Sequence, residues 1–548
     1  MLFCMKCETQ CMKCESEFIR SFLPVLYGWK LNYLLIMNIY QHSNTYYIKN
    51  ETKPEQEVLE VDLCVYGGTS GGVMAAVQAK RLGYRVVLLV FANRIGGLTA
   101  GGLGATDIGN KAAIGGLSRD FYKKVGEKYG EDISWKFEPS VAHTVFQEIL
   151  QENDIPVYYQ QHLSNVKKEG NQIREIVMEH GQVVRAKMFV DATYEGDLMA
   201  KAGVSFHVGR EAGSVYNEIY NGVQLGHRFH NFDRFVDPYN KPGVPESGLL
   251  PGVEIPDSLE QRAGDHRIQA YNFRMCLTQR EDIRVPFPKP KAYDPERYEL
   301  LARYLATGVW DVLRLSVMMP NEKTDTNNYG GFSSDNIGRN YEWPEGSYEK
   351  REEIFQDHVN YTQGMYWFLS HDERVPPHIR EEMATWGLPN DEFLETGHFP
   401  SELYIREARR MVSAYVMTEQ NCVGALQVED PVGLAAYTMD SHHCRRVLLG
   451  GRVHNEGDVQ IGGFEPYQIS YRSIVPKEEE CGNLMVPFCL SASHIAFGSI
   501  RMEPVFMNLA QSAVTAAHLA MQQGCSLQQV PYEALRKLLL ADGQVLEW

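Results

Sequence analysis

The chain has 548 residues, of which 44% are hydrophobic and 22% are charged. A single hydrophobic core stops growing at roughly 250–300 residues, so we expect two interleaved domains in a soluble globular protein. The formal net charge of −17 opposes nucleic acid as a partner, because affinity for nucleic acids comes largely from Lys and Arg side chains that neutralise phosphates. The composition therefore argues against a disordered chain, a membrane bundle and a protein whose main partner is nucleic acid.

Four of the eleven cysteines stand together near the N-terminus, at Cys4, Cys7, Cys11 and Cys14. Their C-x2-C-x3-C-x2-C spacing superficially suits zinc or an iron–sulfur cluster. The central x3 separation is short for two zinc knuckles, and the letters MKCE occur twice here, as in a tandem duplication. We therefore assign no metal site, and we interpret the seven irregularly spaced cysteines that follow as buried thiols.

Residues 17–40 are rich in Phe, Leu, Ile and Tyr, but polar residues interrupt them. Arg20, Lys30 and Asn32 divide the stretch into pieces shorter than the roughly 20 apolar residues of a membrane span. We expect no transmembrane segment. If translation starts further along the chain, part of this stretch could act as an export signal, although no small-residue cleavage site follows it. These features favour the cytoplasm over export and leave the true translation start open.

The first clear fold signal is a strand, a glycine turn, a helix and a second strand. Residues 44–60 are polar and interrupted by proline, as in a linker, and residues 61–66 (VDLCVY) predict a buried strand. After the glycines at 67–72, residues 73–82 have helical spacing and residues 85–90 (RVVLLV) predict a second buried strand. This order indicates a Rossmann-type βαβ unit, and therefore an α/β fold.

We expect four segments along the chain. Residues 1–58 form an N-terminal extension and linker, and residues 59–210 form the first part of a dinucleotide-binding domain. Residues 211–400 are rich in aromatic residues, prolines and charges without βαβ alternation, which predicts an interleaved α+β substrate or cap domain. Residues 401–548 return to complete the cofactor and substrate sites. Within them, Glu503–Gln523 predicts a long helix with Pro504 in its first turn, where a missing N–H costs nothing.

The turn GGTSGG is the first candidate binding site. Between a buried strand and a helix, backbone N–H groups and the helix dipole can hold a pyrophosphate. Six consecutive residues are candidates for this role: Gly67, Gly68, Thr69, Ser70, Gly71 and Gly72. Thr69 replaces the second glycine of the usual fingerprint, and the second strand ends in Val90, Phe91 and Ala92 instead of a ribose-binding acid. A glycine turn without a nucleotide is the alternative.

A second glycine-rich segment follows, IGGLTAGGLGATDIGN at residues 95–110, with six glycines in sixteen residues. Such a backbone can approach a flat cofactor closely. The cofactor-binding candidates here are Gly96, Gly97, Thr99 and Gly102. A mobile surface loop is the alternative interpretation.

Together with DATYEGD at residues 191–197 and SASHIAFGSIR at residues 491–501, these two segments resemble the bacterial FAD-dependent oxidoreductase family of glutathione-reductase-like flavoproteins, often labelled xanthan-lyase-associated. The resemblance covers residues 61–524. It implies a Rossmann-type, glutathione-reductase-like FAD-binding domain, with the isoalloxazine ring of FAD at the interface with the second domain. It also implies further cofactor-binding candidates: Asp191, Thr193, Gly196, Gly498 and Ser499.

Histidines and arginines supply the catalytic candidates. In DSHH, His442 or His443 could remove a hydroxyl proton while hydride leaves the neighbouring carbon, because the histidine pKa lies near working pH. The alternative is two partly exposed histidines in a turn. The resemblance places His494 and Arg501 near the flavin or the substrate. Residues 404–410 (YIREARR) predict a helix whose arginines bind a carboxylate, bind phosphates or form ion pairs.

The expected function is FAD-dependent transfer of hydride from a small polar molecule, such as a sugar or polyol, with electrons then passing to an unidentified acceptor. Two alternatives stay open. One is a redox-neutral FAD-containing isomerase or lyase, and the other is a non-catalytic protein that binds FAD or a sugar. The sequence does not show the oligomeric state or whether FAD is covalently attached.

Overall fold

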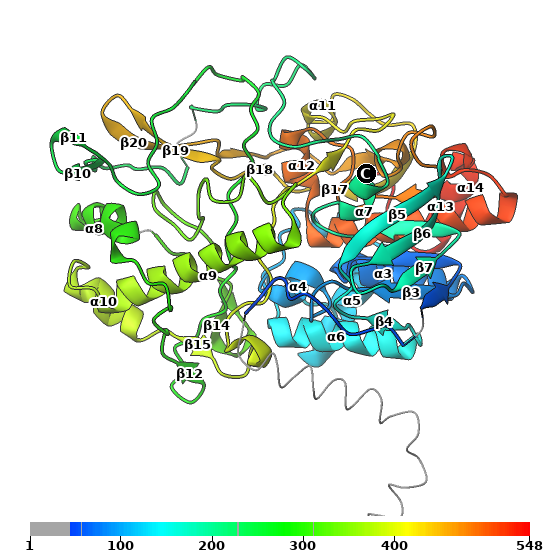
Figure 1. Cartoon of the computed structure of the whole chain (residues 1–548), viewed down its shortest axis with the longest axis horizontal. Helices are drawn as coiled ribbons and strands as arrows, with labels where there is room; N and C mark the ends of the chain where they lie inside the picture. The colour runs from blue at the N-terminus through cyan, green and yellow to red at the C-terminus, as the bar shows by residue number, and fades with distance from the viewer. Residues whose placement is uncertain (1–43, 56, 227–228, 311) are drawn as a thin grey trace, which may run out of the picture.

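The computed structural model describes residues 44–548 except residues 56, 227–228 and 311 (Figure 1). The Cys4–Cys14 cluster and residues 17–40 lie outside the described residues. Among the described residues, no helix combines the length and apolar character needed to cross a bilayer.

A five-stranded parallel sheet forms the centre of the first unit, in the order β23-β8-β2-β3-β4. Its strands are β2 (Leu63–Tyr66), β3 (Val86–Leu89), β4 (Val157–Tyr158), β8 (Met188–Asp191) and β23 (Leu484–Met485). Strands β2, β3 and β8 are buried along their whole length, as expected for a parallel sheet covered on both faces. Helix α3 (Ser70–Arg81) connects β2 to its parallel neighbour β3, as the βαβ prediction requires.

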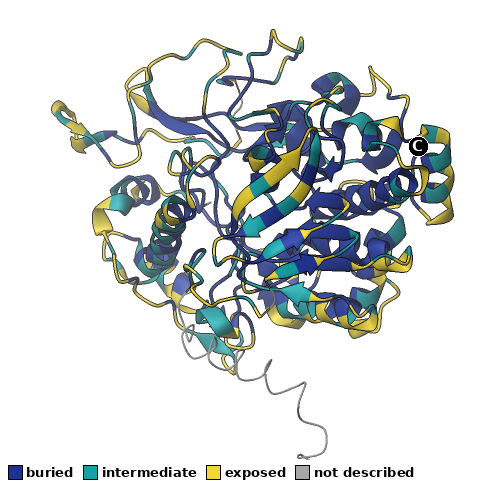
Figure 2. Ribbon diagram, turned by 45° about the vertical axis from the view of Figure 1, so that its right-hand side comes forward, coloured by how far each residue is buried: buried dark blue, intermediate teal, exposed yellow. Residues whose placement is uncertain are grey.

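Helices and a second sheet cover this parallel sheet. Helix α13 (Glu503–Gln523) has the bounds expected from the sequence and packs along α3. The other covering elements are α5 (Gly116–Lys128), α6 (Pro139–Glu152), α14 (Tyr532–Ala541), and a sheet in the order β1-β7-β6-β5 with β1 (Val58–Glu60), β5 (Leu163–Glu169), β6 (Gln172–Met178) and β7 (Val183–Arg185). Buried residues are concentrated in the parallel sheet and the helices beside it (Figure 2).

The middle of the chain forms a second hydrophobic core around helices instead of a parallel sheet. Its helices are α8 (Glu299–Ala306), α9 (Tyr348–His371) and α10 (Pro377–Ala384), which lie in the left half of Figure 1. Leu403 and Val453 also belong to this core, so the return segment contributes to both units. The region is mixed α and β without βαβ units, in line with the expected α+β character.

Short antiparallel pairs connect the rest of the chain. These pairs are β10 (Tyr239–Lys241) with β11 (Val244–Leu249), β12 (Arg284–Val285) with β15 (Leu388–Pro389), β13 (Met318–Met319) with β14 (Lys323–Thr324), β16 (Arg410–Met411) with β9 (Phe206–His207), β17 (Pro431–Ala435) with β22 (Tyr467–Ser470), β18 (Met439–Ser441) with β21 (Val459–Ile461), and β19 (Arg445–Leu449) with β20 (Arg452–Glu456). Four short helices complete the fold: α4 (Gly97–Gly101), α7 (Asp197–Lys201), α11 (Glu419–Cys422) and α12 (His494–Ile500).

Residues 404–410 are not the helix that the sequence predicts. The segment is extended and ends in β16, where Arg410 pairs with His207 of β9. The physical reason is that its arginines have buried partners in different directions. Arg406 binds Asp335, and Arg409 binds Asp197. One helical face could not satisfy these distant carboxylates.

The turn between β2 and α3 yields the first prediction. A Cβ on Gly72 would lie 2.0 Å from the carbonyl oxygen of Gly67, too close for any side chain. We expect Gly72→Ala to lower the melting temperature by several degrees, because overpacking a close backbone contact costs about 1–3 kcal/mol or more. Gly433→Ala is the matched control, since its Cβ would meet nothing closer than 3.5 Å. Equal melting temperatures for the two variants would show that the turn is not tightly constrained.

Candidate active site

Four glycines let the β2–α3 turn fit between its neighbours. Gly67 has a φ of +119°, and a Cβ there would lie 2.5 Å from the Ala192 carbonyl oxygen. A Cβ on Gly68 would lie 2.5 Å from Val90 Cγ1 and one on Gly71 would lie 2.6 Å from the Phe488 ring. Together with the Gly72 contact, these distances show that at each of the four positions neighbouring atoms lie too close to leave room for a Cβ.

Thr69 departs from the usual fingerprint because it caps α3. Its hydroxyl oxygen accepts a hydrogen bond from the N–H of Gly72 at 3.1 Å, and the hydroxyl donates to the carbonyl of Ala192 at 2.8 Å. A threonine in this position stabilises a helix N-terminus. The N–H groups of Ser70 and Gly71 precede the capped one in the first turn, where helix donors have no intrahelical acceptor and can hold an anion.

The glycine-rich segment is buried from Ile95 to Leu103, so it is not the exposed loop of the alternative interpretation. It lies against the turn, with the N–H of Gly96 donating to the carbonyl of Gly68 at 2.7 Å. Gly96, Gly97 and Gly102 all have positive φ angles, of +96°, +52° and +147°. The structure therefore places the two glycine segments predicted from the sequence, residues 67–72 and 95–110, in contact with each other.

Glu503, which the sequence reasoning did not select, joins these segments at the start of α13. Its carboxylate accepts hydrogen bonds from the hydroxyls of Ser70 at 2.5 Å, Thr99 at 2.8 Å and Tyr194 at 2.7 Å. Burial raises the pKa of Glu503, and the bonds from Ser70, Tyr194 and Thr99 oppose that rise. The available sequence signal was only an acid immediately before Pro504.

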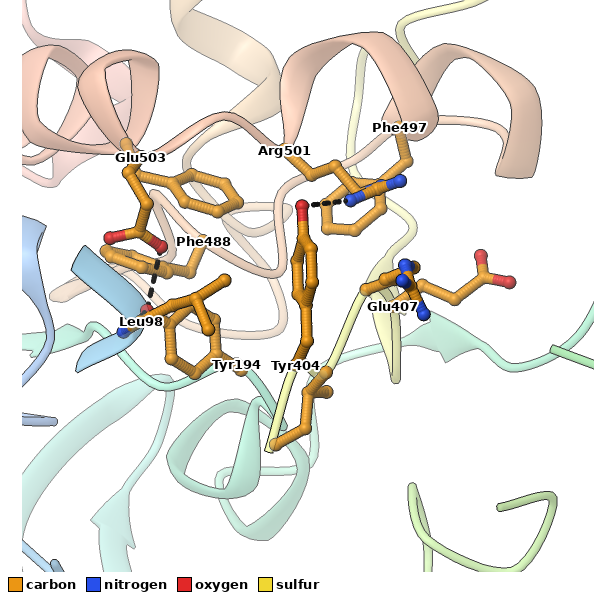
Figure 3. Close-up of a pocket in the computed structure, with 11 residues that line it drawn as sticks. Leu98, Tyr194, Tyr404, Glu407, Phe488, Phe497, Arg501 and Glu503 are labelled. Carbon is orange, nitrogen blue, oxygen red and sulfur yellow. Dashed lines mark hydrogen bonds between the residues drawn. The ribbon is translucent and has the colours of Figure 1, made fainter. Parts of the chain in front are cut away.

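An aromatic slot lies between Glu503 and Arg501 (Figure 3). The slot is lined by Leu98, Tyr194, Tyr404, Phe488, Phe497 and Phe506. Its free volume is about 10 Å³, so the walls must separate before a flat ring can enter. The lining is suited to an aromatic ring system, because ring faces and edges pack favourably on such a ring.

Three buried arginines surround Tyr404. Their guanidinium carbons lie 4.6 Å (Arg406), 5.5 Å (Arg501) and 5.8 Å (Arg274) from the centre of its ring. Arg501 also donates to the Tyr404 hydroxyl at 2.8 Å. Among the described residues, the Nε of Arg501 is buried and has no hydrogen-bond partner. The arginine cluster therefore has donor capacity that the protein itself does not use.

Four aspartates balance this positive charge. Arg406 lies 3.0 Å from Asp335, and Arg501 lies 3.3 Å from Asp440. Arg274 binds Asp325 at 2.7 Å and Asp107 at 3.1 Å. The site beyond the slot is thus dense in charge but close to neutral overall.

His442 is held between two of these aspartates. Its Nδ1 lies 2.8 Å from Asp335 Oδ2, and its Nε2 lies 3.6 Å from Asp440 Oδ2. Burial raises the pKa of Asp335, but Arg406 and His442 outweigh burial and lower it to about 2. The pKa of Asp440 is likewise lowered by His442 and Arg501 against the effect of burial. Both carboxylates are therefore ionised at neutral pH and can orient the imidazole.

The other two histidine candidates have different environments. His443 is buried, and its Nε2 lies 2.9 Å from the carbonyl oxygen of His230. His494 contacts Glu407 through Nδ1 at 2.8 Å and Ser441 through Nε2 at 3.0 Å. The DSHH segment is thus a buried strand end, and not the partly exposed turn of the alternative interpretation. Of the three histidines, the structure brings His442 into the charged cluster beside Arg501.

The remaining candidates stabilise the backbone around the site. Asp191 accepts hydrogen bonds from the Thr193 hydroxyl at 2.7 Å and from the N–H of Met199 at 2.8 Å. Thr193 in turn accepts from the N–H of Gly196 at 2.9 Å. These side chains therefore make hydrogen bonds within their own turn, beside the Gly67–Gly72 segment.

Gly498 and Ser499 bring α12 against β18. A Cβ on Gly498 would lie 2.6 Å from the carbonyl oxygen of Asp440. Ser499 donates to the carbonyl of Tyr437 at 2.5 Å and also bonds the Tyr467 hydroxyl at 2.8 Å. The structure does not place Ser499 among the residues that line the slot.

The family model for FAD-dependent oxidoreductases matches residues 62–539. That span is most of the chain, so the protein belongs to the FAD-dependent oxidoreductase family, and it is an enzyme whose cofactor is FAD. No curated protein sequence matches this chain.

Solved structures of flavoenzymes are weakly similar to parts of the chain. A flavin-containing monooxygenase from Stenotrophomonas maltophilia is 18% identical over 30% of this chain and 45% of its own, with a TM-score of 0.19. An L-amino acid deaminase from Proteus vulgaris is 16% identical over 30% of this chain and 54% of its own, with a TM-score of 0.22. A Diels-Alderase of pyrroindomycin biosynthesis is 13% identical over 28% and 37%, with a TM-score of 0.22. Because these similarities are weak and cover only part of each chain, they do not indicate the substrate.

The residues present fit FAD. The glycine turn and the first N–H groups of α3 suit its pyrophosphate. The aromatic slot suits its ring system, and the unpartnered Nε of Arg501 is a donor at one end of that slot. In the described residues, no group of three or more His, Cys, Asp or Glu side chains is arranged to hold a metal ion.

The environment of His443 yields a prediction about pH. Burial lowers the pKa of His443 to about 3 in the folded protein, whereas an unfolded histidine titrates near 6.5. As the pH falls from about 6.5 toward 3, the unfolded chain binds a proton here that the folded protein does not, so stability is lost. We expect the melting temperature of His443→Asn to fall less than that of the parent when the pH is lowered from 7.5 to 5. Parallel losses in both proteins would show that His443 is protonated in the fold.

Proposed function

We propose that this FAD-dependent oxidoreductase oxidises a hydroxyl-bearing carbon of a small polar molecule, with His442 as the base that takes the hydroxyl proton. The observation that carries the proposal is the position of His442. It lies between Asp335 and Asp440, and Asp440 also contacts Arg501 at the wall of the aromatic slot. A proton acceptor thus stands beside the place suited to the flavin ring.

The two aspartates support a base in different ways. Asp335 Oδ2 accepts the hydrogen on Nδ1 at 2.8 Å, which leaves the lone pair on Nε2 as the proton acceptor. Asp440 lies 3.6 Å from Nε2 and stabilises the imidazolium that forms when the proton arrives. General-base catalysis of this kind typically contributes about 10²–10⁴-fold to the rate.

Arg501 has a separate role in this proposal. When bound, FAD supplies the acceptor for the hydride that leaves the substrate carbon. The guanidinium of Arg501 is fixed by Tyr404 and Asp440, and its free Nε favours negative charge at the slot. It therefore stabilises a reduced, more negative ring system or holds an oxygen of the substrate.

The charge balance of the site supports a neutral polyhydroxylated substrate, such as a sugar or polyol. Three arginines face four aspartates, so a net anion or cation gains little, whereas hydroxyl groups both donate and accept. The electrons then leave to an acceptor that the proposal does not specify. The proposal includes a glutathione-reductase-like arrangement, in which segments 59–210 and 401–548 hold FAD and segment 211–400 covers the substrate.

The redox-neutral isomerase or lyase is the second candidate. The residues that line the slot are largely buried, which also suits an FAD that is reduced and reoxidised within one turnover. The third candidate, a protein that binds FAD or a sugar without catalysis, would not explain why two aspartates orient His442. Anaerobic mixing with sugars and polyols separates these readings, because only the first leaves reduced flavin after the substrate is consumed.

The test variant is His442→Ala. We expect it to retain FAD and to reduce its flavin about 10²-fold more slowly or worse under anaerobic rapid mixing, because the proton acceptor is gone. His443→Asn serves as the matched control in the same segment and should keep the parent rate, since its side chain contacts the His230 carbonyl instead of the charged cluster. A parent rate in His442→Ala would assign the base to another residue.

A further inference from the structure

The end of β3 lacks the group that usually binds the adenosine ribose. In Rossmann-type sites, an acid at the end of the second strand accepts hydrogen bonds from the ribose hydroxyl. Here β3 ends at Leu89 and is followed by Val90, Phe91 and Ala92. None of these three side chains can accept such a bond, and Oδ1 of the next residue, Asn93, already accepts one from Gln160 at 3.1 Å.

The N-terminal strap, residues 44–48, reaches this point of the fold. The ring of Tyr46 lies 5.7 Å from the ring of Phe91, measured between centroids, and 4.7 Å from that of Trp343 in an edge-on arrangement. The sequence predicts a linker here, but the structure shows a segment packed against both units. Tyr46 therefore stands directly beside the position where the acid is missing.

Helix α9 and the cap region hold the strap in place. The carboxylate of Glu352 accepts hydrogen bonds from the N–H groups of Tyr46 at 2.7 Å and Tyr47 at 2.8 Å. Gln356 donates to the carbonyl of Asn44 at 2.7 Å, and the Asn44 side chain donates to the carbonyl of Pro400 at 2.9 Å. These bonds fix the position of the Tyr46 ring without any contribution from a ligand.

Glu195 is the carboxylate that Tyr46 orients. The Tyr46 hydroxyl donates to Glu195 Oε1 at 3.1 Å. Glu195 is only 1% exposed, and its second oxygen, Oε2, has no hydrogen-bond partner among the described residues. A buried polar atom without a partner costs free energy, which indicates a donor that the protein itself does not supply.

The backbone of Glu195 is also fixed. Arg409 donates to its carbonyl oxygen at 3.0 Å and to the Asp197 carboxylate at 2.7 Å. Arg351 binds the same carboxylate through two hydrogen bonds, of 2.6 and 2.8 Å. The segment follows β8, whose neighbour in the sheet is β2, so Glu195 lies on the same edge of the sheet as the glycine turn.

We propose that Glu195 and Tyr46 form the binding site for the adenosine ribose of FAD. Glu195 Oε2 accepts a hydrogen bond from a ribose hydroxyl and replaces the acid that β3 lacks. Tyr46 is a positioning residue, because it fixes Glu195 through Oε1 and covers the end of β3 with its ring. The inference rests on FAD as the cofactor, and it is independent of the substrate and of the proposed base.

The experiment measures the Kd of FAD for the apoprotein by the change in flavin fluorescence. Burial raises the pKa of Glu195 to about 7, so FAD binding is compared at about pH 8.5, where the carboxylate is ionised. A hydrogen bond to a charged group contributes about 10- to 100-fold in affinity, so Glu195→Met, which has no acceptor oxygen, should weaken FAD binding by about that factor. An FAD analogue without the 2′-hydroxyl of the adenosine ribose should bind the parent more weakly. Glu195→Met should then show no further loss with this analogue, because the two changes remove the same hydrogen bond.

Glu179→Gln is the matched control. Glu179 accepts a hydrogen bond from the hydroxyl of the next strap residue, Tyr47, at 2.8 Å. It is therefore a second carboxylate that binds the strap, but its partner is Tyr47 and not Tyr46. Its replacement should leave the Kd of FAD within about twofold of the parent. Thermal melting of each apoprotein shows whether a variant is folded before its Kd is compared.

Three outcomes would overturn the inference. The first is a parent-like Kd for Glu195→Met, and the second is an analogue penalty of the same size in parent and variant. The third is tighter FAD binding by Tyr46→Ala, which would show that the ring obstructs the site. A parent apoprotein that binds no FAD would instead contradict the cofactor assignment itself, so the two failures are distinguishable.

Discussion

The buried carboxylate of Glu503 is the interaction on which the site depends. A carboxylate that is removed from water must be hydrogen-bonded, and three hydroxyls donate to this one. Ser70 begins α3, Thr99 lies in α4 and Tyr194 follows β8, while Glu503 itself begins α13. Four segments that are distant in sequence therefore meet at one point, between the glycine turn and the aromatic slot.

Charge organises the space beyond the slot. The arginines around Tyr404 are buried, which is costly unless each has a partner, and the aspartates supply those partners. Two of these aspartates, Asp335 and Asp440, also contact His442, so the network that neutralises the arginines includes the histidine that we propose as the base. Asp335 and Asp440 thus neutralise buried arginines and also orient His442. Replacing either aspartate should affect both the stability of the fold and the proposed proton transfer.

Local signals account for what the sequence predicted well. The β2–α3–β3 unit follows from apolar runs around a glycine turn, and α13 follows from a long apolar pattern with Pro504 in its first turn. The extended course of residues 404–410 could not be predicted, because the carboxylates that bind Arg406 and Arg409 come from distant segments. The same holds for Glu503, which lies 433 positions from Ser70 in the sequence. The role of Tyr46 likewise depends on contacts that no local pattern indicates.

The most direct test of this account is a structure determined with FAD bound. The account predicts the pyrophosphate at the N–H groups of Ser70 and Gly71 and the ring system in the aromatic slot, between Tyr194 and Phe488 on one side and Arg501 on the other. It also predicts His442 on the substrate side of that ring. A ring system outside the slot, or a pyrophosphate away from the glycine turn, would contradict the account.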